Sequence, residues 1–372
     1  MSNAKTRRFS RGIAAAAAVV CAGSLAQAQT PATLTLPDSL LAPGTQMKWV
    51  KKVPAYCEGP AVDPNEGTVY FTEQRDNGNL SYPIWKIRPD VPGDTGSRWI
   101  TSSNQSNGLF VDGQGRVVAA QKWRIARYKK DGSLDSVLAT SGKTAGFNQA
   151  NDLSLGKDGI FFTDLGPDIF FASQGTAKIV ASGINGANGI EWLEAEKVLN
   201  VQSTGVNRRY DVGADGALSN PRDFFPVSIG DGCEVDSHGN LYLADYWEGA
   251  VFVVNPQGAK IGTIAFNSQA APYDPTAGKQ GNVDNCHFGG KDWKTLYCTG
   301  DGGLYSLDLK IAGRAWPQSA ASTGLRPGLE SGLSRRKAPL QASRAYRADG
   351  RGWNAAREKD RGPRLPAIPY AY

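Results

Sequence analysis

The sequence of 372 residues has little of what most hydrolases use for acid–base and nucleophilic catalysis. It contains only two histidines, His238 and His287, and neither is part of a Cys-His signature. It has no G-x-S-x-G segment, and no glycine-rich segment precedes a predicted helix as a phosphate-binding loop must. Serine-hydrolase, thiol-protease and phosphate-loop chemistry are therefore not indicated. We expect His238 to lie in an exposed turn and His287 to pack on an inner strand.

Long apolar segments are also scarce. The apolar run at Ile13–Val20 is far shorter than the ~20 residues that a membrane-spanning helix needs. It follows a basic segment that contains Arg7 and Arg8, and it precedes the small-residue sequence ending at Ala28. These features predict a cleavable export signal at residues 1–28, cut after Ala28, and a periplasmic or secreted protein without a membrane span. Sec and twin-arginine export both remain open.

The net charge of +6 does not indicate a nucleic-acid partner, because the basic residues are concentrated at the two ends. From Arg314 onward there are 12 basic and 4 acidic side chains. The segment between residue 28 and Arg314 has 25 basic and 31 acidic side chains, so this part of the chain is acidic. Residues 313–372 are rich in Arg, Ala, Pro and Gly, which predicts a disordered tail. We expect truncation after Lys310 to leave stability and activity unchanged.

Four cysteines follow the predicted signal: Cys57, Cys233, Cys286 and Cys298. Their spacings match no zinc-binding pattern. Cys286 and Cys298 flank a turn, so a hairpin would place them opposite each other, where an exported protein could oxidise them. Alternatively, all four are small buried hydrophobic residues.

Six short segments repeat one pattern: an acid or amide, usually a glycine, then apolar residues, a turn and a second strand. The leading residues are Glu58, Asn107, Asn151, Asn188, Asp231 and Asp284, spaced by 49, 44, 37, 43 and 53 residues. This period fits the ~40–50 residues of a four-stranded propeller blade. We therefore predict an all-β, six-bladed β-propeller over residues 29–312, with a metal-binding central channel. An early strand near Met47–Val50 is available to complete the last blade.

Closure of six blades would bring the six leading residues to one axis. Carboxylate and amide oxygens are hard ligands that suit Ca²⁺, with Mg²⁺ as an alternative and Zn²⁺ less favoured. Any single Asn-Gly or Asp-Gly pair is more commonly a turn than a ligand. The shared blade position of Glu58, Asn151, Asn188 and Asp231 is what indicates a cation site.

The motifs at these positions resemble the gluconolactonase/regucalcin (senescence marker protein) family. The resemblance covers roughly residues 50–310, in the segments Glu58-Gly59-Pro60, Asn151-Asp152, Ala187-Asn188-Gly189-Ile190, Asp231-Gly232 and Phe288-Gly289-Gly290. It implies a six-bladed propeller with one divalent cation in the channel, held by Glu58, Asn188 and Asp231. Asn151 is either a fourth ligand or a substrate contact. The cation would be Ca²⁺, with Zn²⁺, Mg²⁺ or Mn²⁺ as alternatives.

The residues around this predicted cation depart from the family pattern. Gln149 occupies the position of an arginine that touches the sugar lactone, and Gln121-Lys122-Trp123-Arg124 replaces a histidine followed by paired arginines. We nevertheless predict Asn107, Trp123, Gln149 and Asn151 as substrate contacts. The metal ligands match while the substrate contacts differ, so the lactone is not specified.

The resemblance implies a metal-dependent hydrolase, a monomeric sugar-lactone lactonase. A polarised lactone carbonyl would be attacked by water, with Asp231 as general base and Asp284 as the second candidate. One alternative is an organophosphate or ester hydrolase that uses the same site. Another is a non-catalytic propeller that binds a sugar or a protein, for which Trp123 and Trp247 would provide a stacking surface.

Overall fold

The structure is a computed structural model that describes residues 30–74, 81–141, 146–156, 158–266 and 282–314. All regular elements in these ranges are β-strands, as the sequence pattern predicts. No helix within them is long and apolar enough to cross a membrane. The predicted export signal, and all of the predicted tail except Gly313 and Arg314, lie outside the described residues.

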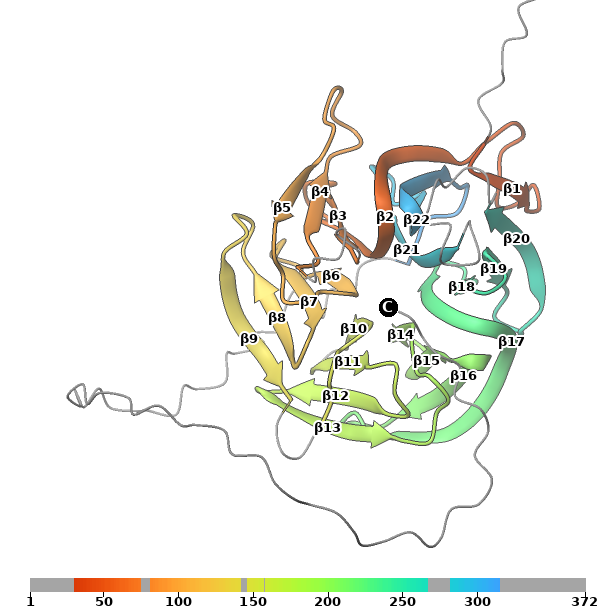
Figure 1. The fold of residues 1–372 in the computed structure, drawn as a ribbon. Helices are drawn as coiled ribbons and strands as arrows, with labels where there is room; N and C mark the ends of the chain where they lie inside the picture. Colours follow the sequence, from red (N-terminus) through yellow and green to blue (C-terminus); the bar gives the residue numbers. More distant parts are fainter. Residues whose placement is uncertain (1–29, 75–80, 142–145, 157, 267–281, 315–372) are drawn as a thin grey trace, which may run out of the picture. The chain divides into compact units, whose positions relative to one another are not determined.

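Antiparallel pairing arranges the described strands in six blades around a central channel (Figure 1). Blade 1 contains the second part of β2 (Lys48–Val62), β3 (Val69–Glu73), β4 (Ile84–Ile87) and β5 (Ser97–Ile100). Blade 2 contains β6 (Leu109–Val111), β7 (Val117–Gln121), β8 (Arg124–Tyr128) and β9 (Leu134–Thr140). Blade 3 contains β10 (Leu153–Leu155), β11 (Ile160–Thr163), β12 (Ile169–Ser173) and β13 (Thr176–Ala181).

The other three blades share long strands with their neighbours. Blade 4 contains β14 (Ile190–Leu193), β15 (Val198–Gln202), β16 (Thr204–Val212) and the first part of β17 (Leu218–Val235). Blade 5 contains the second part of β17, β18 (Leu241–Asp245), β19 (Ala250–Val254) and β20 (Lys260–Phe266). Blade 6 contains β21 (Val283–Gly289), β22 (Thr295–Asp308) and the first part of β2.

The first part of β2 closes the ring of blades, as the sequence predicts for the segment near Met47–Val50. Lys48 pairs with Ser306 of β22 in blade 6, whereas Cys57, further along β2, pairs with Glu73 of blade 1. This closure leaves no unpaired edge between the first and last blades. The sequence reasoning did not foresee β1 (Ala32–Thr35), which pairs with β20 and adds an outer strand to blade 5.

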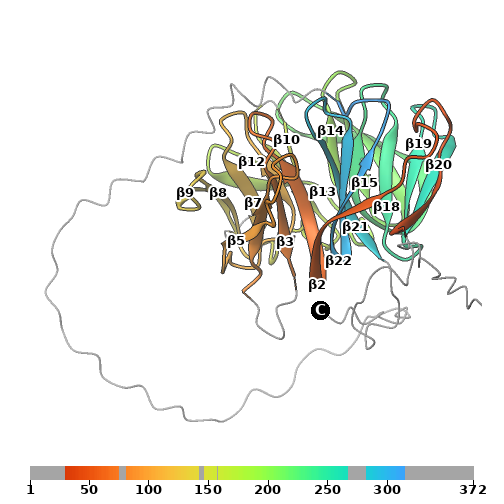
Figure 2. The same cartoon turned by 90° about the horizontal axis from the view of Figure 1, so that it is seen from above.

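The innermost strands form a closed cycle around the channel. In order they are β2, β6, β10, β14, β17 and β21; each contacts the next, and β21 contacts β2. Each runs antiparallel to the second strand of its blade, and the blades stand side by side around the channel (Figure 2). Neighbouring inner strands approach each other at equivalent positions, since Gly59 lies against Gly108 and Gly189 lies against Gly232. Equivalent positions on the six strands therefore lie in layers across the channel. This layering turns the sequence repeat into a site.

The hydrophobic core lies between adjacent blades. In one interface, Phe161 and Phe171 of blade 3 pack with Leu199 and Val201 of blade 4. Burial of each large apolar side chain contributes roughly 1.5–3 kcal/mol, so these interfaces hold the inner strands in register.

All four cysteines of the described residues are buried and free. Cys286 and Cys298 are direct partners in the β21–β22 ladder, with 2.9 Å between their Sγ atoms, which confirms that the hairpin places them opposite each other.

The described chain continues to interact with the blades beyond Lys310. Gly313 N donates to the Trp293 carbonyl at 2.8 Å, and Arg314 N donates to the Val235 carbonyl at 3.0 Å. The Arg314 guanidinium also pairs with Glu196. These contacts correct the expectation that nothing after Lys310 contributes to the fold. The blades are held by residues up to at least Arg314, two residues beyond the predicted boundary at 312.

Candidate functional site

Six acid and amide side chains, one from each blade, lie in one layer at the start of the innermost strands. This axial ring consists of Glu58, Asn107, Asn151, Asn188, Asp231 and Asp284. All six are buried, with exposed fractions between 0% and 8%. The charges of Glu58 and Asp231 act on each other and on Asp284, and the Asn188 side chain lies close enough to Asp231 to lower its pKa. The predicted ligands Glu58, Asn188 and Asp231 are thus brought together.

Buried threonines at the ends of the second strands hold the backbone of the axial ring. The Thr163 hydroxyl donates to the Asn188 carbonyl at 2.6 Å, and the Thr72 hydroxyl donates to the Asn107 carbonyl at 3.1 Å. In each case the threonine belongs to the preceding blade. The alcohol that closes a second strand in the repeat therefore positions the ring residue of the next blade.

The carboxyl groups of the axial ring have strongly shifted acidities. Burial, followed by the charge of Asp152, raises the pKa of Glu58 to about 8. Burial and then the charges of Glu58 and Asp152 raise the pKa of Asp231 well above its usual range. Burial, and then the charges of Glu58 and Asp231, also raise the pKa of Asp284 well above its usual range. Clustered buried carboxylates repel each other, so the ring favours a bound positive charge.

Several oxygens of the axial ring have no hydrogen-bond partner among the described residues. They are Asn188 Oδ1, Asp231 Oδ1 and both carboxylate oxygens of Asp284. The Tyr56 hydroxyl lies close enough to Asp284 to lower its pKa slightly, but it does not form a hydrogen bond of good geometry. A buried acceptor without a partner is costly unless another group satisfies it. Oxygens of this kind are the ligands that Ca²⁺ and Mg²⁺ prefer, so the residues fit a hard cation.

Within the described residues, no group of three or more His, Cys, Asp and Glu side chains is arranged to hold a metal ion. A cation in the axial ring would therefore need amide oxygens as well as carboxylates. The repeat predicts a ligand set of this mixed kind, in which the carboxylates of Glu58 and Asp231 act together with the amides of Asn151 and Asn188.

Glycines follow the axial ring in four blades and allow the inner strands to approach closely. They are Gly59, Gly108, Gly189 and Gly232. A Cβ atom on Gly189 would lie 2.0 Å from the Asp231 carbonyl oxygen, and one on Gly232 would lie 2.0 Å from the Asn285 side chain. The glycine of the repeat is therefore required by the close approach of neighbouring inner strands and of the Asn285 side chain.

Asp152 and Asn285 take the place of glycine in the other two blades, and their side chains occupy the centre of this layer. Asn285 Nδ2 donates to Asp152 Oδ2 at 3.2 Å, although the residues are 133 positions apart. A Cβ atom on Gly108 would lie 2.4 Å from Asp152 Oδ1. We call the four glycines with Asp152 and Asn285 the barrier layer, because it separates the axial ring from the space beyond.

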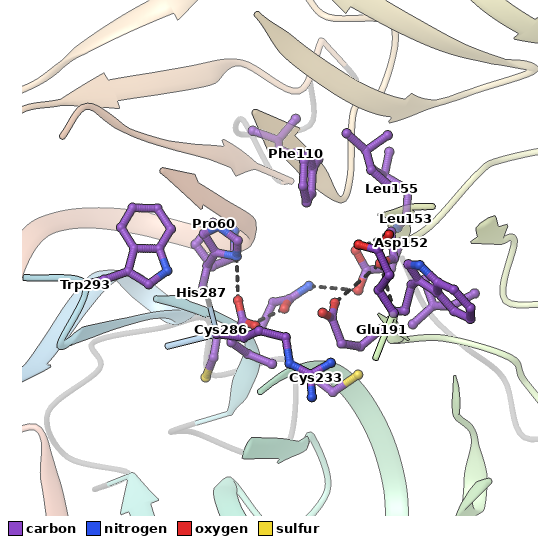
Figure 3. Close-up of a pocket in the computed structure, with 18 of the residues that line it drawn as sticks. Pro60, Phe110, Asp152, Leu153, Leu155, Glu191, Cys233, Cys286, His287 and Trp293 are labelled. Carbon is purple, nitrogen blue, oxygen red and sulfur yellow. Dashed lines mark hydrogen bonds and ion pairs between the residues drawn. The ribbon is translucent and has the colours of Figure 1, made fainter. Parts of the chain in front are cut away.

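Beyond the barrier layer the channel widens into a cavity of about 370 Å³, here called the turn-side cavity (Figure 3). Asp152 and Asn285 form part of its lining, but none of the axial-ring residues does. Its rim is formed by Glu194, Ala195, Trp293 and Arg314, near the turns that follow the inner strands. The cavity and the axial ring therefore lie on opposite sides of the barrier layer.

Two predicted substrate contacts lie together near the axial ring. A backbone bridge pairs Lys122 with Gln149, and the Gln149 side chain donates to the Gln105 carbonyl at 3.4 Å. Trp123 is 55% exposed, and its indole Nε1 donates to Asn148 Oδ1 at 2.9 Å. Gln149 lies two residues before Asn151, so this pair belongs to the side of the ring that faces away from the turn-side cavity.

The exposed Trp123 and Trp247 do not form one stacking surface. Trp123 follows β7 in blade 2, whereas Trp247 follows β18 in blade 5. These blades lie across the channel from each other (Figure 1).

The sequence reasoning assigned no role to Asp152, Asn285, Glu191 or Glu234. The signal for the first two was present, because they are the residues that replace the repeated glycine. His287 packs on its inner strand with a partner, as expected, since its Nδ1 lies 2.7 Å from Glu234 Oε2. Its side chain also lines the turn-side cavity.

The fold and the axial ring define the class of protein: a six-bladed β-propeller with a buried layer of acids and amides across its channel. Residues 56–301 match the family described as the SMP-30/gluconolactonase/LRE-like region. This match spans more than half of the chain, so the protein belongs to that family.

Curated relatives and solved structures agree with this assignment. Regucalcin from Gallus gallus is 25% identical over 255 residues, which cover 58% of this chain and 81% of the relative. Lactonase drp35 from Staphylococcus aureus (strain MW2) is 35% identical over 125 residues, which cover 29% of this chain and 39% of the relative. A gluconolactonase from Xanthomonas campestris has a TM-score of 0.62 at 22% identity, covering 75% of this chain and 97% of that structure. A calcium-binding protein, regucalcin, from Agrobacterium tumefaciens has a TM-score of 0.57 at 17% identity, covering 77% and 96%.

Proposed function

We propose that the protein is a metal-dependent lactonase that opens the ring of a sugar lactone at the axial ring. The observation that carries the proposal is the set of buried oxygens on Asn188 and Asp231 that have no partner among the described residues. Membership of a family whose relatives are named gluconolactonase and lactonase supports the same reaction class.

In this proposal Glu58, Asn188 and Asp231 hold one divalent cation, with Asn151 as a fourth ligand or a substrate contact. Ca²⁺ is the preferred ion, because all of these donors are oxygens and a relative is named as calcium-binding. Zn²⁺, Mg²⁺ and Mn²⁺ are the alternatives. A bound divalent cation supplies Lewis-acid polarisation of the lactone carbonyl.

Asp231 is the proposed general base that takes a proton from the attacking water. Burial and the neighbouring Glu58 and Asp152 raise its pKa, which makes its carboxylate a stronger base near neutral pH. Asp284 is the second candidate, because it shares the axial ring without being a proposed ligand. Its two oxygens have no hydrogen-bond partner among the described residues and are free to accept a proton.

The proposed substrate contacts are Asn107, Trp123, Gln149 and Asn151. An exposed indole such as that of Trp123 can pack against the apolar face of a sugar ring. Gln149 is an uncharged donor where the family pattern has an arginine, so we propose a lactone other than gluconolactone. This substitution also favours the alternative of a non-catalytic sugar-binding propeller.

A substrate panel tests the reaction. The full-length protein is treated with a chelator and assayed with aldonolactones, an aryl ester and a phosphotriester, alone and after addition of Ca²⁺, Mg²⁺, Zn²⁺ or Mn²⁺. We expect metal-dependent hydrolysis of at least one lactone. Preferential hydrolysis of the phosphotriester would assign the ester-hydrolase alternative instead. Lactone binding without turnover under any metal condition would assign the non-catalytic alternative.

We further propose that the protein is exported through the signal at residues 1–28 and acts as a monomer. Fractionation of expressing cells tests the first point, since the processed chain should begin after Ala28 and be found outside the cytoplasm. Light scattering tests the second.

A further inference from the structure

The turn-side cavity has the size and walls of a small-molecule site. Its volume of about 370 Å³ lies within the range of roughly 300–1,000 Å³ that ligand pockets occupy. All six innermost strands contribute to it, so its shape is fixed by the propeller rather than by a loop. It is separate from the axial ring, and nothing in the proposed lactone hydrolysis uses it.

Aromatic side chains form much of the apolar wall. Phe110, Trp192 and Trp293 line the cavity, and Phe110 is directed into it from blade 2 (Figure 3). The Nε1 atom of Trp192 is buried and has no hydrogen-bond partner among the described residues.

Carboxylates face the same space from three blades. Asp152, Glu191 and Glu234 all line the cavity, and Figure 3 shows Asp152 and Glu191 directed toward its centre. Glu191 accepts a long hydrogen bond from the Ser154 hydroxyl at 3.4 Å. Glu234 is paired with His287. Burial, and then the charge of Glu234, raise the pKa of Glu191, so the two glutamates repel each other.

The basic side chain at the rim compensates this charge only in part. Arg314 lines the cavity and lowers the pKa of Glu191, but its two guanidinium nitrogens pair with Glu196 at 3.2 and 3.0 Å. Glu234 already has His287 as a partner, whereas Glu191 has no basic partner of its own among the described residues, so a positive charge beside Glu191 would lie within an aromatic wall. Ammonium groups bind in such surroundings through ion pairing and cation–π attraction.

We propose that the turn-side cavity binds a small organic cation, an amine whose ammonium lies against Glu191 and Glu234 and whose flat apolar body packs against Phe110 and Trp192. A bare metal ion does not account for the aromatic wall, because it would leave most of the apolar lining in contact with water. A neutral apolar molecule does not account for the carboxylates. The site is independent of the proposed lactonase activity.

Binding of matched probes to the full-length protein tests the proposal. Protonated 2-phenylethylamine and the neutral 2-phenylethanol have nearly the same shape, so calorimetric titration with both, in the presence of a chelator, isolates the contribution of the charge. We expect the amine to bind one site at least about tenfold more tightly than the alcohol. Equal affinity for the two probes, or no binding of the amine, would overturn the proposal.

Two variants test where the amine binds. Glu191→Gln keeps the size of the side chain and removes its charge, and we expect it to weaken amine binding about tenfold or more. Ala195→Trp adds a large side chain at the rim and should block binding, whereas Ala214→Trp, at an exposed turn elsewhere in blade 4, should not. Ala195→Trp changes an exposed residue and keeps the test valid if Glu191→Gln folds poorly.

The remaining alternative is that the cavity binds a metal ion instead of an amine. Titration of the amine complex with Ca²⁺ should leave the amine bound. Stoichiometric displacement of the amine by Ca²⁺ from the wild-type protein, together with weaker direct binding of Ca²⁺ to Glu191→Gln, would show that the cavity is a metal site and would contradict the proposal. These readouts measure binding alone, so failure of the lactonase assay would not affect them.

Discussion

The two ends of the channel are built from the same six strands but have different chemistry. On one side of the barrier layer, each blade contributes an acid or an amide, and the six side chains form a buried polar layer. On the other side, carboxylates from three consecutive blades and aromatic and aliphatic residues surround an open cavity. Only the axial ring follows the sequence repeat in all six blades; the residues of the turn-side cavity differ from blade to blade.

Under the two proposals, this difference separates two functions along one axis. The axial ring offers only oxygen donors to a small ion, whereas the turn-side cavity offers volume, aromatic walls and charge to a larger molecule. Asp152 belongs to both regions, because it raises the pKa of Glu58 and also lines the cavity.

Removing the proposed base gives the largest expected effect and concerns only the axial ring. We expect Asp231→Asn to reduce kcat for lactone hydrolysis by about 10²–10⁴, the usual contribution of a general base, with further loss if metal binding also fails. Steady-state kinetics with the best lactone of the panel measures it. The exposed Asp215→Asn is the matched control. A kcat within a factor of about three of wild type for Asp231→Asn would transfer the role of base to Asp284.

The shifted acidity of the ring predicts a pH-dependent stability in the absence of metal. The pKa of Glu58 is about 8 in the folded protein and 4.5 as the ordinary value, so the native state binds more protons than the unfolded state between these limits. Its contribution to stability therefore falls as the pH rises from ~4.5 to about 8 and changes little above that. The melting temperature of the metal-free protein should therefore fall between pH ~4.5 and about 8.

Two additions sharpen this measurement. Excess Ca²⁺ should reduce the fall in melting temperature, because the cation binds the ionised ring. Glu58→Gln should reduce the pH dependence of the melting temperature of the metal-free protein. A melting temperature that rises with pH across this range would mean that the ring is not a cluster of unfavourable buried acids.

The barrier layer can be broken with a single methyl group. A Cβ atom on Gly189 would lie 2.0 Å from the Asp231 carbonyl oxygen, so the two inner strands must separate in Gly189→Ala. We expect a loss of about 1–3 kcal/mol in the free energy of unfolding, measured by denaturant titration. Gly213→Ala is the control, since its nearest neighbour would be 3.5 Å away. Equal stability of both variants would show that the close approach of strands is not required.

The smallest effect concerns the end of the described chain. A protein truncated after Lys310 lacks three backbone hydrogen bonds, from Ser237 to Ala312, from Gly313 to Trp293 and from Arg314 to Val235, each worth about 1 kcal/mol. The partly exposed Arg314–Glu196 pair adds little. We expect truncation after Lys310 to be less stable by about 1–3 kcal/mol than truncation after Arg314. Identical unfolding curves for the two truncated proteins would show that residues after Lys310 do not contribute to stability.

The regular part of this architecture could be predicted from the sequence. The repeat located all six inner strands and the residues of the axial ring, because strand alternation and turn residues depend on local sequence. Closure by the segment near Met47–Val50 and the opposition of Cys286 and Cys298 followed from the same pattern. The family resemblance added the proposed roles, which remain predictions.

The irregular features could not be predicted, because they depend on contacts between distant blades. The Asp152–Asn285 hydrogen bond joins residues 133 positions apart; the sequence marks both as replacements of the repeated glycine but does not indicate that they pair. The turn-side cavity arises where side chains of all six blades fail to fill the channel. The pairing of β1 with β20 and the contacts of Arg314 are likewise long-range.

The most direct test of the central claim is to measure Ca²⁺ binding to the full-length protein after a chelator has removed its metal. Isothermal titration should show one Ca²⁺ site in the wild-type protein, and Asn188→Ala, which removes a buried amide oxygen without a partner among the described residues, should weaken it by at least about tenfold. Glu191→Gln, in the turn-side cavity, should retain the wild-type affinity for Ca²⁺. Absence of Ca²⁺ binding in the wild-type protein, or an affinity unchanged by Asn188→Ala and lowered by Glu191→Gln, would contradict the assignment of the cation to the axial ring.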